Sequence, residues 1–189
     1  MADCPLNFSI GTISIWDECT PSIKSGFVKS LQFSPDGLCT ISATENNNAV
    51  ICSLSETCVH KWSYYGSNDD SRCVDSSSSC IDATIPIGES IYDLKWYPGM
   101  QSSNPSTKCF ISTSRDHPII LWDAGSDVGK ANVRCTYRGY DLADELDSAI
   151  SLTFNLAGDK IYAGYERMIR FAFLISSLDY VLLVNSLLF

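Results

Sequence analysis

The chain has 189 residues, of which 45% are hydrophobic and 19% are charged, so it can bury a core of its own and is not a disordered tail. A formal net charge of −9 argues against a protein that coats nucleic acid through bulk positive charge, while leaving room for a local basic patch. The N-terminus has no basic segment followed by an apolar run, so we expect no secretory signal and a place in the cytosol or nucleus.

Nine cysteines, an odd number, occur without any C-x-x-C pair, and the chain has two histidines, His60 and His117. A disulfide framework or a zinc site needs tighter and more regular spacing, so we expect no metal and no cofactor. Cysteines in or beside apolar runs pack as small hydrophobic side chains in a reducing compartment. We therefore expect buried thiols at Cys39, Cys52, Cys109 and Cys135.

In chain order, an N-terminal segment of residues 1–26 comes first, and its weakly alternating run from Leu6 to Trp16 predicts one edge strand. Residues 27–54 then form three short apolar runs separated by two turns. The first turn is Ser-Pro-Asp-Gly at 34–37, where proline presets φ and Asp and Gly follow, and the second is Glu-Asn-Asn-Asn at 45–48. This pattern predicts three antiparallel strands, the first of which ends at Phe33.

A polar, serine-rich insertion at residues 66–82 follows and is predicted as a surface loop. The second copy of the pattern runs from residue 91 to residue 124, has Trp96 in the place of Phe33, and contains a turn enlarged by residues 98–108. Its last run closes on Trp122-Asp123, and Asp116 stands six residues before the tryptophan. That spacing is typical of one blade of a WD-repeat β-propeller.

A third copy occupies residues 150–171, with Phe154 in the place of Phe33. We expect a fourth strand for the first two copies in the connectors near residues 83–87 and 133–137. The sequence thus predicts an all-β fold, a partial WD-repeat β-propeller within residues 27–170. Its blades are about three in number, four-stranded and antiparallel, and lie near residues 27–65, 89–137 and 148–171.

The remaining residues, 171–189, are almost wholly apolar and leave the repeat pattern after Arg170. A propeller closes with about four to eight blades, so we interpret the chain as a piece of a longer protein or as one that depends on a partner. Three interpretations of this tail stay open: an unrelated end of a truncated or alternatively spliced product, a strand or helix that covers a sheet edge, and a membrane anchor. Asp179 disfavours the anchor, because a charge in mid-membrane costs about 2.5–3.5 kcal/mol.

In a WD-type blade, buried hydrogen bonds join the tryptophan of the third strand, a Ser or Thr of the second strand, the aspartate of the turn between them and a histidine of the preceding loop. The second copy offers candidates for this relay, namely Ser112, Ser114, Asp116 and Trp122, with Asp123 completing the Trp-Asp pair. Gly88-Glu89 stands where a Gly-His pair is expected, so the relay is predicted to be incomplete. Cys52 and Ala172 replace the tryptophan in the other two copies.

Several strings resemble the telomerase Cajal body protein family, WD-repeat proteins that guide small Cajal-body RNAs. Residues 91–97 contain I-Y-D and W-Y, and residues 114–124 contain S-R-D, P-I and L-W-D-A. Residues 137–146 contain Y-R, a further Y and D-E-L, and residues 151–154 contain S-L and F. The whole match covers about residues 7–171. The resemblance implies a scaffold without catalytic activity that binds H/ACA small Cajal-body RNAs, and in vertebrates telomerase RNA, together with the H/ACA core proteins. It implies a nuclear location in Cajal bodies, with some protein in the cytoplasm. As further partners we expect the cytosolic chaperonin during folding, but neither DNA nor a membrane.

In the propeller layout, the turns between second and third strands share one face, which places Arg115, His117 and Arg167 together as candidate RNA-binding residues. A guanidinium can pair with phosphate through two hydrogen bonds and can stack on bases. The alternative for Arg115 is an ordinary turn salt bridge with Asp116. The acidic loop at 141–147 would repel phosphate and suit a basic protein partner.

Enzymatic motifs are missing from the sequence, which has no P-loop, G-x-G-x-x-G, H-E-x-x-H or G-x-S-x-G pattern, so we expect no enzyme. Two alternatives to the RNA scaffold stay open. One is a WD-repeat adaptor that binds proteins without RNA contact. The other is an inactive truncated product, or one that does not fold alone, since exposed sheet edges invite pairing with other chains.

Overall fold

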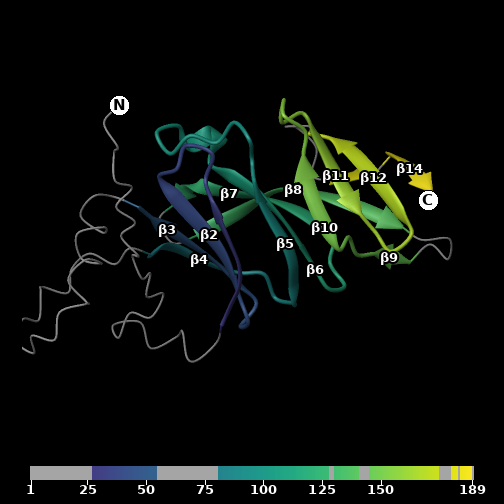
Figure 1. Ribbon diagram of the computed structural model, residues 1–189, viewed down its shortest axis with the longest axis horizontal. Coiled ribbons are helices and arrows are strands. Elements are labelled where there is room, and N and C mark those ends of the chain that lie inside the picture. The colour runs from purple at the N-terminus through teal and green to yellow at the C-terminus, as the bar shows by residue number, and fades with distance from the viewer. Residues whose placement is uncertain are drawn as a thin grey trace, which may run out of the picture.

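The computed structural model describes residues 27–54, 81–127, 130–140, 145–174, 180–182 and 184–188. Within these ranges the chain forms three β-sheets that follow one another along the long axis of the molecule (Figure 1). The predicted all-β fold of about three blades is therefore confirmed. The edge strand expected at residues 6–16 and most of the serine-rich insertion, residues 66–80, lie outside the described residues.

The first sheet is antiparallel throughout and has the strand order β1-β2-β3-β4. Its strands are β1 (Val28–Phe33), β2 (Cys39–Thr44), β3 (Asn48–Ser53) and β4 (Ile81–Pro86). β4 is the fourth strand that the sequence predicted in the connector. Between β1 and β2, Gly37 takes the left-handed conformation (φ 73°), and its N–H donates to the carbonyl of Ser34 at 2.9 Å.

The second sheet is built on the strand order β5-β6-β7-β8, again antiparallel. Its strands are β5 (Ile91–Trp96), β6 (Cys109–Ser114), β7 (Ile119–Asp127) and β8 (Lys130–Tyr140), with the short β9 (Leu146–Asp147) paired to β8. β8 is the second predicted connector strand. The enlarged β5–β6 turn contains the 3-10 helix η1 (Pro105–Thr107), which Asn104 caps by accepting from the N–H of Ser106.

The third sheet has the order β10-β11-β12-β14, and its strands are β10 (Ser151–Phe154), β11 (Lys160–Gly164), β12 (Met168–Phe173) and β14 (Val184–Leu188). The tail was expected to begin at residue 171, whereas β12 continues to Phe173. In the tail, β13 (Tyr180–Leu182) lies parallel to β8, and β14 lies antiparallel to β12. The tail thus pairs with the outer strands of two sheets, as in the interpretation that a strand covers a sheet edge.

The three sheets repeat one hydrogen-bond pattern, which fixes equivalent positions. In each blade, the residue after the first strand donates its N–H to the carbonyl of the first residue of the second strand. The bonds run from Ser34 to Cys39 at 2.8 Å, from Tyr97 to Cys109 at 3.0 Å and from Asn155 to Lys160 at 3.1 Å. It follows that Phe33, Trp96 and Phe154 are equivalent, as predicted. By the same count Leu31, Leu94 and Leu152 are equivalent.

The core lies between the sheets. One cluster joins the first and second blades and includes Ile41, Ile51, Leu94 and Trp96, which are all at most 6% exposed. A second cluster joins the second and third blades and contains Ile111, Leu121, Tyr137, Leu152 and Ile161. The second sheet therefore buries side chains on both of its faces, and every residue of β6 is buried.

Four cysteines confirm the prediction of buried thiols. Cys39, Cys52, Cys109 and Cys135 are each at most 4% exposed. Burial raises the pKa of the Cys109 thiol, and although the charge of Arg134 lowers it in part, the pKa stays at about 11. This side chain is therefore a neutral packing group at physiological pH.

Candidate functional site

The candidate RNA-binding residues lie on the turns that connect the second and third strands of each blade. Arg115 and His117 are on the β6–β7 turn, and Arg167 is on the β11–β12 turn. These turns and the β2–β3 turn point to the same side of the molecule, the lower side of Figure 1, which we call the turn face. The topology thus puts the three residues on one face, as the sequence predicted from the propeller layout.

Arg115 is engaged in two ion pairs. Its Nη2 lies 2.8 Å from Oε2 of Glu89, which belongs to the loop before β5, and its Nε lies 3.7 Å from Oδ2 of Asp116. The hydrogen bond and the charge of Glu89 are the main causes that raise the pKa of Arg115 above its ordinary value. The backbone N–H of Arg115 also donates to the carbonyl of Ser90 at 3.0 Å. Arg115 therefore ties the turn to the preceding loop.

In this chain Gly88-Glu89 stands where a WD-type blade has a Gly-His pair, and Glu89 forms an ion pair with Arg115. In the expected relay, a cationic or neutral donor from the loop meets an acidic residue of the turn. Here the loop supplies the carboxylate and the turn supplies the guanidinium. Sequence reasoning missed Glu89 because the ion pair reverses the expected order of charges along the chain.

His117 is half-buried against the same loop. Its Nδ1 lies 3.0 Å from the carbonyl oxygen of Arg115 and 3.3 Å from Oγ of Ser114. A Cβ added to Gly88 would lie 3.8 Å from Cε1 of the ring, so the imidazole packs beside the loop. Nδ1 of His117 therefore has its hydrogen-bond partners inside the protein, and the rest of the ring is left for external contact.

Arg167 differs from Arg115, because its exposed side chain makes no ion pair with the residues that the structure describes. Three residues further on, Arg170 is 8% exposed and donates from Nη2 to the carbonyl of Tyr140 at 2.7 Å. The guanidinium of Arg170 also stacks on the ring of Tyr165 at 4.6 Å and lies 3.6 Å from Asp147. Burial raises the pKa of Tyr165 to about 12, so the phenol stays neutral beside the cation.

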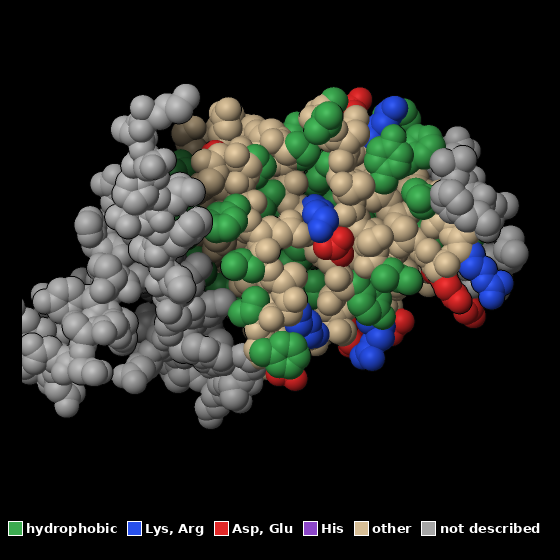
Figure 2. All heavy atoms as spheres, in the orientation of Figure 1, with side chains coloured by type: hydrophobic (Ala, Val, Ile, Leu, Met, Phe, Trp, Pro, Cys, Tyr) green, Lys and Arg blue, Asp and Glu red, His purple; other side chains and the backbone are tan. Residues whose placement is uncertain are grey.

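Three other basic side chains in the described ranges form ion pairs with aspartates. Lys95 lies 2.9 Å from Asp93, Arg134 lies 3.0 Å from Asp123, and Lys108 lies 3.8 Å from Asp82. On the face shown in Figure 2, several of the described Lys and Arg side chains lie beside Asp or Glu side chains. This mosaic of both signs offers a few cationic groups for local contacts in place of a broad basic surface.

The relay candidates of the second blade are placed as follows. Nε1 of Trp122 donates to Oγ of Ser112 at 2.8 Å, and both residues are buried. Asp116 lies in the left-handed conformation (φ 57°) with a carboxylate that is 84% exposed, away from this buried pair. Ser114 contacts His117, and Asp123 accepts from the N–H of Gly125 at 2.9 Å. The structure therefore joins Trp122 to Ser112 and leaves Asp116 at the surface.

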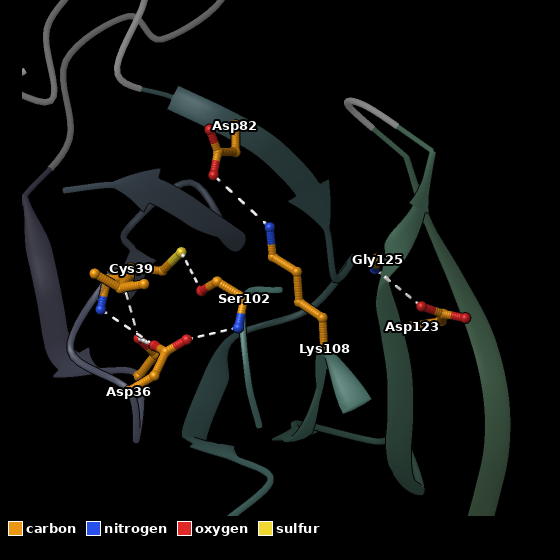
Figure 3. Close-up of polar contacts among 9 residues, drawn as sticks. Asp36, Cys39, Asp82, Ser102, Lys108, Asp123 and Gly125 are labelled. Carbon is orange, nitrogen blue, oxygen red and sulfur yellow. Dashed lines mark hydrogen bonds and ion pairs between the residues drawn. The ribbon is translucent and has the colours of Figure 1, made fainter. Parts of the chain in front are cut away.

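Polar contacts at the opposite face join the first and second blades through the enlarged β5–β6 turn (Figure 3). Oδ2 of Asp36 accepts from the N–H of Ser102 at 2.5 Å, and Sγ of Cys39 lies 3.4 Å from Oγ of Ser102. Partial burial raises the pKa of Asp36, but the hydrogen bonds donated by Ser34, Ser102 and Leu38 outweigh it and hold that pKa well below its usual value.

A second contact in Figure 3, between Asp82 of β4 and Lys108, spans the same junction. Burial raises the pKa of Asp82, and the charge of Lys108 counteracts this. Oδ2 of Asp93 makes the corresponding link between the second and third blades by accepting from the N–H of Leu152 at 2.9 Å. These contacts are structural, and no local pattern predicted them, because the two partners of each contact lie in different repeats.

Within the described ranges, no group of three or more His, Cys, Asp or Glu side chains is placed to hold a metal ion. In the same part of the chain, no helix is long and apolar enough to cross a lipid bilayer.

Comparison with known proteins finds several relatives that share one name, although no family model matches the chain. It is 31% identical to Telomerase Cajal body protein 1 homolog of Drosophila melanogaster, over 76% of this chain and 25% of that protein. It is 31% identical to Telomerase Cajal body protein 1 of Mesocricetus auratus, over 78% and 25%, and 29% identical to that of Homo sapiens, over 82% and 26%. The chain thus spans about a quarter of the length of these relatives.

Among solved structures, the chain is similar to Sqt1 of Chaetomium thermophilum, which was crystallised bound to the N-terminus of a ribosomal protein. The TM-score is 0.51 at 18% identity, and the match covers 84% of this chain and 33% of Sqt1. This likeness supports the fold, a part of a WD-repeat β-propeller.

Proposed function

Because this chain belongs to the telomerase Cajal body protein family of WD-repeat proteins, we propose that it serves as a scaffold for small Cajal-body ribonucleoproteins. In this role it binds H/ACA small Cajal-body RNAs, telomerase RNA among them, and directs them to Cajal bodies in the nucleus with the H/ACA core proteins. The observation that carries the proposal is the identity of about 30% to proteins of that name over some four-fifths of the chain. We infer a role other than catalysis, since these relatives are named for Cajal bodies and telomerase and not for a reaction.

The turn face supports local RNA contact through a small number of side chains. Arg167 is exposed and has no ion-pair partner among the described residues, so it can meet a phosphate without giving up another contact. Arg115 is 58% exposed in its side chain and can exchange Glu89 for a phosphate, since surface ion pairs are worth little. Single-stranded loops are the RNA elements that such isolated guanidinium groups recognise best.

The acidic side chains of the turn face limit this contact to a narrow site. Glu45, Glu89, Asp116, Glu145 and Glu166 all lie on the turns or loops of that face. Their charge repels a long phosphate backbone, so we expect selective binding of one short loop and weak binding of bulk RNA.

The experiment is ultraviolet cross-linking of the tagged chain in nuclei of its own cells, followed by sequencing of the recovered RNA. The variant Arg115→Ala/Arg167→Ala should recover several-fold less H/ACA RNA while its solubility is unchanged. Lys160→Ala is the matched control, because Lys160 begins β11 at the end opposite to the turn that carries Arg167. Equal recovery from the double variant and the wild type would eliminate the turn face as the RNA site.

A protein-binding adaptor without RNA contact is the second candidate. Two observations favour it: the acidic turn face, and the similarity in fold to Sqt1, which binds the N-terminus of a ribosomal protein. An acidic face suits a basic peptide partner. Recovery of no specific RNA from the wild-type chain, in an experiment in which a full-length relative does recover it, would favour the adaptor or an inactive product.

A further inference from the structure

Tyr92 is an exposed aromatic residue at the end of β5 that lies on the turn face. It is the second residue of the strand, and Ile91 before it pairs with Ser114, the last residue of β6 ahead of the β6–β7 turn. The register of this pairing shifts between Ile91 and Asp93, so Tyr92 is the extra residue of a β-bulge. Bulges redirect side chains and are frequent beside functional sites. Tyr92 is accordingly 46% exposed, whereas Ile91 is 6% exposed.

The same position has a different side chain in each blade. Lys29 is the extra residue where the pairing of β1 with β2 shifts between residues 28 and 30, and Ile150 takes the corresponding place directly before β10. Both residues are exposed, as Tyr92 is. At one level of the turn face, the three blades thus present a cation, an aromatic ring and an aliphatic side chain.

Two cationic residues are brought near Tyr92 by their contacts with Ser90. Nζ of Lys29 lies 3.2 Å from Oγ of Ser90, and the backbone N–H of Arg115 donates to the carbonyl of Ser90 at 3.0 Å. The hydrogen bond and charge of Glu89 are the main causes that raise the pKa of Arg115, and Tyr92 is near enough to contribute as well. A lysine of the first blade and an arginine of the second therefore meet two residues before the exposed ring.

The carboxylates close to Tyr92 in the chain are already engaged. Glu89 is held in its ion pair with the β6–β7 turn at 2.8 Å, and Oδ1 of Asp93 lies 2.9 Å from Nζ of Lys95. Lys29, in contrast, has no carboxylate partner among the residues that the structure describes. A phosphate can therefore approach Lys29 beside the ring without displacing an ion pair.

We propose that Tyr92 is a stacking residue of the turn face, on which an unpaired base of an RNA loop lies while Lys29 and Arg115 contact neighbouring phosphates. This inference rests on the RNA-binding role proposed above and names the part of the RNA that the face takes. Stacking on an aromatic ring favours unpaired bases of any sequence, because every base has a π-face, whereas a duplex keeps its bases inside. Tyr92 thus makes the turn face select single-stranded loops over stems.

The surroundings of the ring suit a base better than a protein partner. The flanking apolar residues of β5, Ile91 and Leu94, are 6% and 1% exposed, so Tyr92 does not continue into an apolar surface along its own strand. Stable protein interfaces bury wide continuous patches. Surfaces that hold single-stranded nucleic acid instead combine individual aromatic rings with cations that follow the backbone, which is the arrangement of Tyr92 with Lys29 and Arg115.

The test is binding of the purified chain to hairpin RNAs with randomised loops, enriched on the wild type, and to duplexes of the same stem without a loop. The wild type should prefer the hairpins. Tyr92→Leu keeps an apolar side chain but removes the ring, and should weaken hairpin binding about tenfold with little change in duplex binding. Tyr92→Phe should bind as the wild type does, since it retains the ring.

Phe173→Leu is the matched control, because Phe173 is 50% exposed and ends β12 at the side opposite to the β11–β12 turn. It should leave hairpin binding unchanged. Lys29→Ala should reduce the slope of log affinity against log salt by about 0.7, the value of one phosphate contact on a single strand.

The outcomes separate this inference from the proposed function. Hairpin binding that is equal for Tyr92→Leu and the wild type, or equally weakened in Tyr92→Leu and Tyr92→Phe, would overturn the stacking role and leave RNA binding in place. A wild type that binds no hairpin, in a series in which a full-length relative does, would overturn both. Loss of a co-purifying protein from Tyr92→Leu, with RNA binding unchanged, would assign the ring to a protein contact and overturn the stacking role alone.

Discussion

Replacing Arg170 by methionine should lower the free energy of unfolding by about 3 kcal/mol. Arg170 on β12 is 8% exposed and reaches across the junction to the second blade, where it donates to the carbonyl of Tyr140 and faces Asp147. Breaking a buried ion pair costs about 3–5 kcal/mol, and the 30% exposure of the Asp147 side chain reduces that because water can reach the remaining charge. The lost stacking on Tyr165 adds roughly 0.5–2 kcal/mol, while methionine retains most of the packing volume.

The measurement is equilibrium unfolding in urea, followed by tryptophan fluorescence, for Arg170→Met and for a matched control. Arg167→Met is that control, since it removes the same group from an exposed position on the adjoining turn and should change stability by at most about 0.5 kcal/mol. Equal losses for the two variants, or a loss under about 1 kcal/mol for Arg170→Met, would refute the argument that the buried guanidinium holds the second and third blades together.

Two further predictions concern the first and second blades. Hydrogen bonds in the folded state depress the pKa of Asp36 below the ordinary value of a free aspartate, so the stability they provide is present above that ordinary value and is lost as the pH falls below it. Asp36→Asn should cost roughly 1 kcal/mol at pH 7, a figure reduced for exposure, and should flatten the acid limb of a stability curve measured from neutral to strongly acidic pH. Trp122→Phe removes the indole N–H that donates to Ser112 and should cost about 1–2 kcal/mol. With Ser112→Ala in addition, urea unfolding should show a loss smaller than the sum of the two single losses, and strict additivity would contradict the bond.

The strands could be predicted because their signals are local. Alternation of apolar residues has a period of two, and the turn at 34–37 has Pro, Asp and Gly at positions that need their φ angles, so β1 to β3 end within a residue of where the pattern ends. The connector strands β4 and β8 followed from the rule that a blade has four strands. These features need no knowledge of what the blade packs against.

Contacts between blades could not be predicted in this way. Asp36 and Ser102 are 66 residues apart and meet only because two sheets lie side by side, and the partner of Asp36 sits in a turn whose enlargement is peculiar to the second blade. The sequence singled out Asp36 for its turn chemistry alone. Its second task, accepting from the N–H of Ser102, depends on the spatial order of the sheets.

Asp116 illustrates the opposite case, in which a sequence position is clear and its structural role is not. The spacing to Trp122 marks the residue as the turn aspartate of a WD-type blade. Its left-handed φ of 57° puts it at the tip of the turn, where the carboxylate is 84% exposed and pairs with Arg115. A spacing rule identifies the position in the repeat, whereas the direction of the side chain depends on backbone angles and on the partner in the preceding loop.

The reversed ion pair has a consequence for function on the turn face. Glu89 and Arg115 connect the loop before β5 to the β6–β7 turn, so phosphate that takes Arg115 from Glu89 also loosens that connection. Binding at Arg115 would then change the position of the loop that leads into the second blade, whereas binding at Arg167, which has no such partner among the described residues, would leave the blade as it is. If RNA binds here, Arg167 therefore supplies affinity at little structural cost, and Arg115 makes binding depend on the order of the neighbouring loop.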